Sequence, residues 1–240
     1  MPTAPNDLRW LAAAARLALR GRPLSRPNPA VGALVVRGDV VLGRGWTQAG
    51  GRPHAEAMAL AQAGDKARGA TVYVTLEPCA HQSPRGPACA DLLAAAAPAR
   101  IVVGVQDPDP RTAGQGMARL RAAGIDVIQD DCAACRDSLA GYLVQRRQGR
   151  PHVTLKLALS LDGGISTASG ESRWITGPAA RAHVHSRRAL ADAIVVGGAT
   201  WRVDQPALDV RLPGLEARSP QRLVVSHAAV DGAETLSSPA

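Results

Sequence analysis

Apolar and polar residues follow two different rhythms along the first part of the chain. Leucine and alanine recur at helical spacing between Asp7 and Arg20, and Gly21 follows, so this stretch is predicted to be a helix. Short apolar runs at 31–36 and 40–42 enclose Arg37-Gly38-Asp39, a pattern typical of a β-hairpin. The chain is therefore expected to open with one helix followed by two paired strands.

Strand-like and helix-like stretches continue to alternate up to residue 128. Helices are expected at 54–63, at 88–96 and from 114 onward, and strands at 70–76, at 100–105 and up to 128. Strands that alternate with helices build a sheet with helices packed on both faces. The first part of the chain is thus expected to be an α/β domain.

The second part of the chain repeats this theme. The polar segment 145–151 ends in Pro151 and is interpreted as a boundary, which divides the chain into domains 1–147 and 148–240. Strands are expected at 153–159, 193–196 and 222–226, with a helix at 178–190. After Ser226 the pattern gives only a polar, small-residue tail through Ala240, so the second α/β domain is expected to be incomplete.

The bulk composition narrows the class of protein. Of 240 residues, 46% are hydrophobic and 20% charged, and no apolar run approaches the roughly 20 residues of a membrane span. No secretory leader opens the chain, so a cytoplasmic location is expected. The net charge of +8 comes from scattered arginines, which does not favour nucleic acid as a partner and suits a phosphorylated small molecule equally well. Four cysteines without an export signal indicate metal or redox chemistry before disulfides.

One imidazole and two thiols stand at predicted helix starts. His54 opens one helix, Cys79 follows Pro78 after a predicted strand, and Cys89 comes shortly after. This nitrogen and sulfur set suits Zn²⁺, and three protein ligands leave the fourth tetrahedral position open for a water that zinc activates. Glu56, two residues after His54, is placed to carry protons without being a ligand. Singly, each residue is more often a helix cap, a surface charge or a buried apolar group, but their combination predicts a hydrolytic deaminase.

These motifs resemble known proteins. HAE at 54–56 and the run Thr75 to His81 (TLEPCAH) resemble the cytidine deaminase superfamily. Pro27 to Gly32 (PNPAVG), Asp107 to Pro110 (DPDP) and several strings of the second half extend the resemblance, over nearly the whole chain, to the bifunctional riboflavin-biosynthesis family RibD. The family resemblance implies a cytidine deaminase-like α/β/α sandwich followed by a dihydrofolate reductase-like α/β domain.

The same resemblance implies two activities and their residues. The first is deamination of 2,5-diamino-6-ribosylamino-4(3H)-pyrimidinone 5′-phosphate, with the metal on His54, Cys79 and Cys89, proton transfer by Glu56, and Asn28 in the pyrimidine pocket. The second is NADPH-dependent reduction of the ribosyl group. Residues implied at the NADPH are Ala158, Trp174, Thr200 and Asp204. Residues implied at the substrate of this second step, its phosphate included, are Lys156, Ser172, Arg188, Leu208 and Arg211.

Two departures from the family pattern affect these expectations. Nine residues separate Cys79 from Cys89 where the family usually has one fewer, and the extra residue either bulges harmlessly or displaces a substrate-contacting loop. The family's reductase half also continues past residue 240 into a glycine-rich stretch, so NADPH binding and reductase activity are expected to be impaired in this chain.

Two alternative functions stay open. The first is a nucleoside or nucleic-acid deaminase, although such enzymes typically space their cysteines as Pro-Cys-x-x-Cys and stack bases on aromatic residues, and this chain has no Phe. The second is a decayed homologue without activity in which zinc only holds the fold together, against which the presence of Glu56 argues. An incomplete second domain would also expose apolar surface, which makes a homo-oligomer plausible.

Overall fold

The computed structural model describes residues 5–81 and 83–228. The chain divides into two compact units, Met1–Val153 and Thr154–Ala240. The domain boundary after residue 147 stays a prediction.

A five-stranded sheet forms the centre of unit 1, in the order β2-β1-β3-β4-β5. The strands are β1 Gly32–Arg37, β2 Val40–Trp46, β3 Thr71–Val74, β4 Arg100–Val103 and β5 Asp126–Gln129. β1 pairs antiparallel with β2 and with β3, whereas β3, β4 and β5 are parallel to one another. The predicted hairpin and the three later strands are confirmed.

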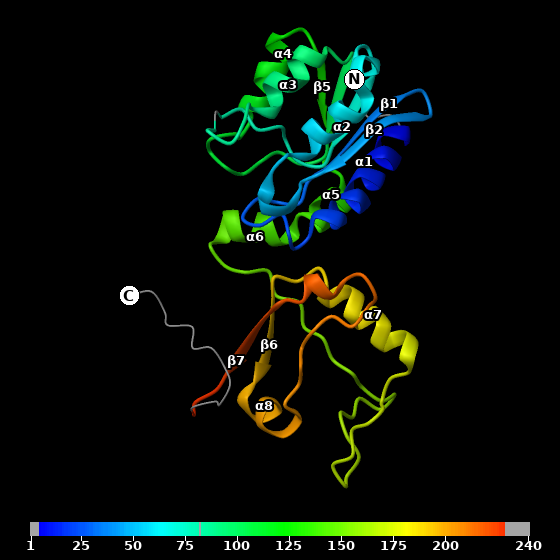
Figure 1. The fold of residues 1–240 in the computed structure, drawn as a ribbon, viewed down its shortest axis with the longest axis vertical. Coiled ribbons are helices and arrows are strands. Elements are labelled where there is room, and N and C mark those ends of the chain that lie inside the picture. Colours follow the sequence, from blue (N-terminus) through cyan, green and yellow to red (C-terminus); the bar gives the residue numbers. More distant parts are fainter. Residues whose placement is uncertain (1–4, 82, 229–240) are drawn as a thin grey trace. The chain divides into compact units, whose positions relative to one another are not determined.

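Helices cover both faces of this sheet. The helices of unit 1 are α1 Pro5–Ala18, α2 Ala55–Ala63, α3 Cys89–Ala96, α4 Gln115–Ala122, α5 Ala133–Ser138 and α6 Ala140–Gln148, with 3₁₀ turns η1 Leu19–Gly21, η2 Ala49–Gly51 and η3 Gly64–Ala67. α1 and α5 pack together on one side, and α2, α3 and α4 form a layer on the other (Figure 1). Between the layers lies a core whose largest fully buried side chains include Leu11, Leu93, Ile101, Leu120 and Leu139. The expected α/β sandwich is confirmed.

Two glycines of β2 set the position of α2. A Cβ atom at Gly43 would lie 2.1 Å from the carbonyl oxygen of Ala59, and one at Gly45 would lie 2.1 Å from that of Ala55. Because glycine has no Cβ, the backbone of α2 rests directly on the strand. This close approach fixes the start of α2, where His54 and Glu56 stand.

The end of unit 1 differs from the expectation. The polar segment from residue 145 was expected to be a boundary, but residues 145–148 continue α6, which ends at Gln148 and is followed by Gly149 with φ +66°. Leu143 is buried and Tyr142 packs against the core, so the inner face of α6 holds the helix although its outer face is polar. Residues 145–148 therefore belong to a packed helix of unit 1.

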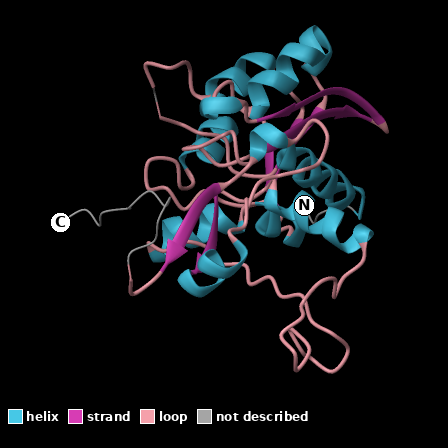
Figure 2. Cartoon of the chain, turned by 60° about the horizontal axis from the view of Figure 1, so that its bottom comes forward, coloured by secondary structure: helices cyan, strands magenta, loops and turns pink. Residues whose placement is uncertain are grey.

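Unit 2 contains α7 Pro178–Arg188, β6 Ala193–Gly197, α8 Gly198–Asp204, the 3₁₀ turn η4 Glu216–Arg218 and β7 Gln221–Val225. β6 and β7 pair in parallel, which confirms two predicted strands and the predicted helix. The strand expected at 153–159 is wrong, because the stretch before α7 carries neither helix nor strand and is drawn as loop (Figure 2). A strand needs a neighbour to pair with, and Val153 and Leu155 are instead 75% and 78% exposed.

Most of the expected polar tail, from residue 229 to Ala240, lies outside the described residues. In the part of the chain that the structure describes, no helix is long and apolar enough to span a membrane. The cytoplasmic location stays a prediction.

Candidate active site

His54 stands at the N-cap of α2, directly after Pro53, in extended backbone conformation. Its Nδ1 lies 3.2 Å from Sγ of Cys89 and 3.6 Å from Sγ of Cys79. The side of the ring that carries Nδ1 therefore meets both sulfur atoms.

The two cysteines approach one another from different segments. Cys79 follows β3 and Pro78, and Cys89 is the first residue of α3. The backbone N–H of Cys89 donates to Sγ of Cys79 at 3.3 Å. Hydrogen bonds from the Cys89 thiol and the His54 ring lower the pKa of Cys79 to about 4, whereas the bond to Cys79 and burial raise the pKa of Cys89. These contacts favour the thiolate form of Cys79, which is the form that binds metal.

The three donor atoms fit a zinc ion. Among the described residues they form one group of potential ligands, with all three atoms within 4.8 Å of one another. Zn–S bonds of about 2.3 Å and Zn–N bonds of about 2.0 Å at tetrahedral angles leave donor atoms about 3.5 to 3.8 Å apart. The observed nitrogen to sulfur distances are 3.2 and 3.6 Å, so one agrees with this spacing and the other is about 0.3 Å shorter. The nine residues between the cysteines therefore allow the cluster to form.

Glu56 lies in the first turn of α2 and is only 3% exposed. Burial raises the pKa of its carboxyl group, an effect that the His54 ring partly opposes. A carboxyl group whose pKa is shifted toward neutrality is suited both to accept and to return a proton.

Asn28 lies against the far side of the His54 ring. Its Nδ2 is 3.2 Å from Nε2 of His54 and donates to the carbonyl oxygen of Gly51 at 3.0 Å. A Cβ atom at Gly51, where φ is +86°, would lie 2.7 Å from Cγ of Asn28, so only glycine fits there. Asn28 can therefore orient the imidazole as well as face the cavity.

A cavity of about 500 Å³ opens over these residues. Its walls include residues that the sequence predicted and many that it did not: Pro27, Asn28, Pro29, Val31, Thr47, Arg52, His54, Glu56, Leu76, Glu77, Cys79, His81, Ser83, Arg85, Asp107, Asp109, Arg111, Thr112, Tyr142, Gln145 and Arg146. The volume lies within the range of small-molecule sites, about 300 to 1,000 Å³.

A signal in the sequence could have revealed part of this wall. Asp107 and Asp109 follow β4 as Cys79 follows β3, and the carboxyl ends of adjacent parallel strands meet at one edge of a sheet. No comparable signal marked Tyr142 and Arg146, because no helix was expected at residues 140–148.

Glu77 ties this wall to the cysteine loop. Its carboxylate accepts backbone N–H groups from Asp107 at 3.3 Å, Gly114 at 2.9 Å and Met117 at 3.2 Å. α4 begins at this point, so a buried carboxylate satisfies free N–H groups at the start of the helix. Glu77 therefore holds the loop after β4 in place beside Pro78 and Cys79.

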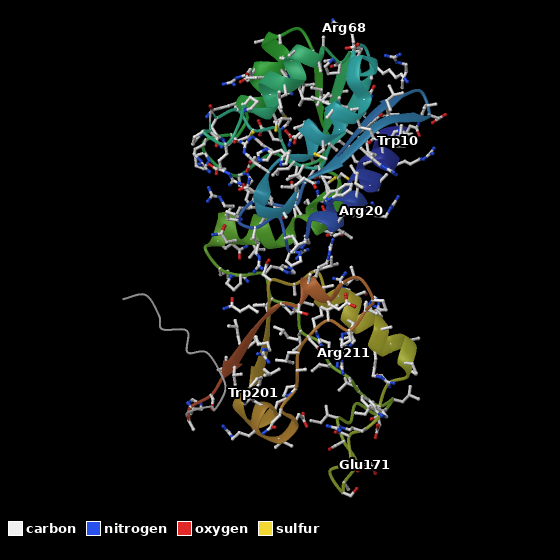
Figure 3. All side chains as sticks on the ribbon, viewed as in Figure 1. Trp10, Arg20, Arg68, Glu171, Trp201 and Arg211 are labelled. Atoms are coloured by element: carbon white, nitrogen blue, oxygen red, sulfur yellow. The ribbon has the colours of Figure 1, made fainter. Side chains whose placement is uncertain are left out.

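In unit 2 the structure gathers some of the predicted residues. Arg188 donates to the carbonyl oxygen of Asp209 at 2.5 Å, and Nε of Arg211 lies 3.4 Å from Oδ1 of the same residue. His185 accepts the backbone N–H of Arg211 at 3.2 Å. Leu208, the residue before Asp209, is buried and has a φ of +53°. Arg188 and Arg211 thus both contact Asp209, the first through its backbone carbonyl oxygen and the second through its carboxylate. Arg211 is labelled in Figure 3.

The other predicted residues of unit 2 lie on separate segments. Thr200 and Asp204 are exposed on α8, and Trp174 is 72% exposed with the Arg181 guanidinium 4.3 Å from its ring centre. The remaining three stand in the stretch before α7: Lys156, Ala158 and Ser172. Ser172 follows Glu171, which Figure 3 shows at the tip of a long loop.

Two known families match the two halves of the sequence. The family described as "Cytidine and deoxycytidylate deaminase zinc-binding region" matches residues 5–105, which contain the His54, Cys79 and Cys89 cluster. Unit 1 is thus a zinc-binding domain of the cytidine deaminase class. The family described as "RibD C-terminal domain" matches residues 151–235.

Similar whole proteins carry both parts. The Riboflavin biosynthesis protein RibD of Escherichia coli (strain K12) is 47% identical over 215 residues, which are 89% of this chain and 58% of the relative. The solved structure of Acinetobacter baumannii RibD has a TM-score of 0.79 at 43% identity and covers 92% of this chain and 63% of its own. A Thermotoga maritima structure, a diaminohydroxyphosphoribosylaminopyrimidine deaminase/5-amino-6-(5-phosphoribosylamino)uracil reductase, has a TM-score of 0.82 at 36% identity over 91% of this chain and 62% of its own. The chain belongs to the RibD family and spans 58% of the length of its E. coli relative.

Proposed function

We propose that unit 1 catalyses zinc-dependent hydrolytic deamination of 2,5-diamino-6-ribosylamino-4(3H)-pyrimidinone 5′-phosphate in riboflavin biosynthesis. The product is 5-amino-6-(5-phosphoribosylamino)uracil. The observation that carries the proposal is that three zinc-type donors and a buried carboxyl group line one cavity in a RibD-family chain.

In this proposal each residue has a defined task. His54, Cys79 and Cys89 hold the ion, and bound zinc supplies the Lewis acidity that makes water a nucleophile near neutral pH. Glu56 takes one proton from the attacking water and delivers it to the ring nitrogen. The other proton of the same water then passes to the amino group, which leaves as ammonia while the water oxygen becomes the carbonyl oxygen of the product. Asn28 orients the His54 ring and contacts the pyrimidine.

The experiment that tests this function measures ammonia released from the diaminopyrimidinone ribosyl phosphate by the zinc-loaded chain. Glu56→Gln is the control, because it retains the shape of the side chain but cannot carry the proton. We expect release by the unchanged chain and a loss of at least a hundredfold in the variant. Equal release by both proteins would remove Glu56 from the mechanism. No release despite bound zinc would favour a decayed homologue, and release from cytidine or single-stranded DNA would favour the other deaminase class.

For unit 2 we propose NADPH as cofactor, bound weakly by this chain alone. The family match over residues 151–235 supports the cofactor, and the exposure of Trp174 and of Thr200 and Asp204 on α8 supports the weak binding. Titration of NADPH fluorescence checks both parts. A dissociation constant below about 10 μM, or NADPH consumption coupled to substrate, would contradict the proposed impairment.

We also propose that copies of the chain associate. Several large apolar side chains of unit 2 are exposed, among them Leu155, Leu161 and Val203, and such surface favours association. Light scattering coupled to gel filtration gives the mass, and a monomer at high concentration would refute this proposal.

A further inference from the structure

Two arginines from different segments line the cavity and meet at one acidic residue, Asp109, which does not belong to the His54, Cys79 and Cys89 cluster. Arg111 lies in the loop after β4, and Arg146 lies on α6. Both line the cavity, and both form an ion pair with the carboxylate of Asp109. The structure thus holds two permanent positive charges at one place in the wall.

The geometry of this group is well defined. Nη2 of Arg111 lies 2.7 Å and Nη2 of Arg146 lies 2.8 Å from Oδ2 of Asp109, and Nε of Arg111 donates to Oδ1 at 3.0 Å. The Asp109 side chain is only 8% exposed, and its bonds to Arg111 lower its pKa to about 2. The carboxylate therefore stays ionised at neutral pH and fixes both guanidinium groups, which leaves the group with a net charge of about +1.

Both arginines retain donors for a ligand. Arg146 uses Nη2 for Asp109, and in the described part of the chain no partner is found for its Nε or Nη1. Arg111 likewise uses Nε and Nη2 and keeps Nη1. Their side chains are 34% and 67% exposed, so an incoming anion can reach them. A guanidinium fork that is already oriented loses little freedom when it binds an anion.

A second contact keeps α6 at the cavity. Tyr142, four residues before Arg146 and thus on the same helix face, donates its hydroxyl to Oδ1 of Asp107 at 2.7 Å. The same oxygen accepts the backbone N–H of Asp109 at 2.9 Å. Tyr142 and Arg146 therefore dock α6 on the Asp107 to Asp109 segment at two points.

The cavity contains two further arginines, which are held differently. Arg52 donates to the carbonyl oxygen of Pro87 at 3.4 Å, and Arg85 donates to that of Gly50 at 2.5 Å. These bonds join two loops to one another, and no ion pair between these arginines and an acidic residue is found among the described residues. Arg111 and Arg146 share one anchor and so present paired charge, the arrangement that suits a dianion.

We propose that Arg111 and Arg146, oriented by Asp109, form the subsite of unit 1 that binds the phosphate group of the substrate. This inference rests on the proposed deaminase function. The zinc-type cluster and Glu56 then act on the pyrimidine at one part of the cavity, while the guanidinium pair fixes the ribosyl phosphate at another. α6 becomes a binding element of the deaminase unit.

The kinetic test compares Arg146→Ala with Arg147→Ala. Arg147 is the next residue of α6, is exposed and lies outside the cavity wall, so it is a matched control for charge and helix stability. We expect Arg146→Ala to raise KM for the phosphorylated substrate about ten- to hundredfold with little change in kcat, because a charge-assisted bidentate contact is lost. KM for the same compound without its phosphate should change less than twofold. Arg146→Lys should recover part of the loss.

A binding test separates this inference from the proposed activity. Ribose 5-phosphate and inorganic phosphate are titrated calorimetrically into the zinc-loaded chain and into both variants. We expect binding of ribose 5-phosphate that weakens at least tenfold in Arg146→Ala and is unchanged in Arg147→Ala, whether or not the chain releases ammonia. Absence of ammonia release with this binding pattern would refute only the deaminase.

Three outcomes would overturn the subsite. The first is equal binding by the unchanged chain and Arg146→Ala, with both melting at the same temperature. The second is an equal loss in the Arg146 and Arg147 variants, which would show only an effect of net charge. The third is a loss confined to Arg85→Ala, which would place the phosphate at the loops that carry Arg52 and Arg85.

Discussion

Replacement of Gly45 by alanine tests whether β2 positions the metal cluster through α2. A Cβ atom at Gly45 would lie 2.1 Å from the carbonyl oxygen of Ala55 and 2.7 Å from Cβ of Met58, where ordinary contact begins at 3.4 Å. The start of α2 would have to move by about 1.3 Å, and both close neighbours are backbone or Cβ atoms that cannot rotate away. Overpacking of this kind costs about 1 to 3 kcal/mol.

The same movement would reach the zinc ligand. His54 is the residue immediately before Ala55, so its Nδ1 would shift by a distance several times the roughly 0.2 Å that a metal site tolerates. We expect Gly45→Ala to reduce zinc affinity at least tenfold and to lower the free energy of unfolding by about 1 to 3 kcal/mol. Competition with a chromogenic chelator measures the affinity, and urea unfolding followed by circular dichroism measures the stability.

Gly141→Ala is the matched control for this prediction. Gly141 lies in α6, and nothing stands within 4 Å of a Cβ atom there, so alanine should leave zinc affinity unchanged and stabilise the helix by up to about 1 kcal/mol. If Gly45→Ala binds zinc and unfolds as the unchanged chain does, the close packing of β2 on α2 does not position His54.

Three other changes test the remaining parts of unit 1. Zinc at about 100 times its dissociation constant should raise the free energy of unfolding by about 2.7 kcal/mol, and a chelator should remove this gain. Scanning calorimetry of the unchanged chain and of Cys89→Ala measures the effect. If the melting temperature of the unchanged chain does not depend on zinc, the cluster is not a metal site. Asp109→Asn should cost about 1 to 2 kcal/mol at pH 7, after allowance for the exposure of Arg111, because the pKa of Asp109 is lowered from 3.8 to about 2. The difference in unfolding free energy between the unchanged chain and Asp109→Asn is complete above pH 4 and disappears as the pH falls toward 2. Urea titrations across that range measure it, and a difference that does not depend on pH would disprove the ion pair. Glu77→Gln should lower the free energy of unfolding by about 1 to 3 kcal/mol and speed hydrogen exchange at the amides of Gly114 and Met117, because a side-chain amide group cannot accept all three N–H groups. Glu216→Gln is the control, because Glu216 is exposed and accepts one backbone N–H group. Unchanged exchange in Glu77→Gln would show that Glu77 does not hold the loop.

The sheet and the metal cluster could be predicted because their signals are local. The alternating runs of unit 1 gave the strands and the helices from α1 to α4, and the His54, Cys79 and Cys89 spacing pointed to donor atoms that the structure brings within 4.8 Å of one another. His54 and Cys89 stand where a loop leads into a helix, and Cys79 follows a strand and a proline. Such junctions can be predicted from Pro, Gly and apolar periodicity.

The remaining features depend on contacts between distant residues. The polar outer face of α6 resembles a linker, and only the burial of Leu143 and the Tyr142 bond to Asp107 reveal that it is a packed helix. The alternation at 153–159 is typical of a strand, but pairing requires a partner that the sequence pattern cannot supply. The guanidinium pair of Arg111 and Arg146 was missed because these residues are 35 positions apart and meet only at Asp109.

The register between β1 and β3 shows which edge of the sheet carries the site residues and which carries the hairpin turn. Ala33 pairs with Val74 at the edge where Cys79 and Glu77 follow, whereas Val36 pairs with Thr71 at the other. The hairpin turn at Gly38 therefore lies at the edge opposite the cavity, and nothing stands within 4 Å of a Cβ atom there. Loop tips of this kind accept inserted sequence. A reporter domain or an affinity tag spliced between Gly38 and Asp39, or new chain termini opened there, would leave the chemistry at the far edge undisturbed.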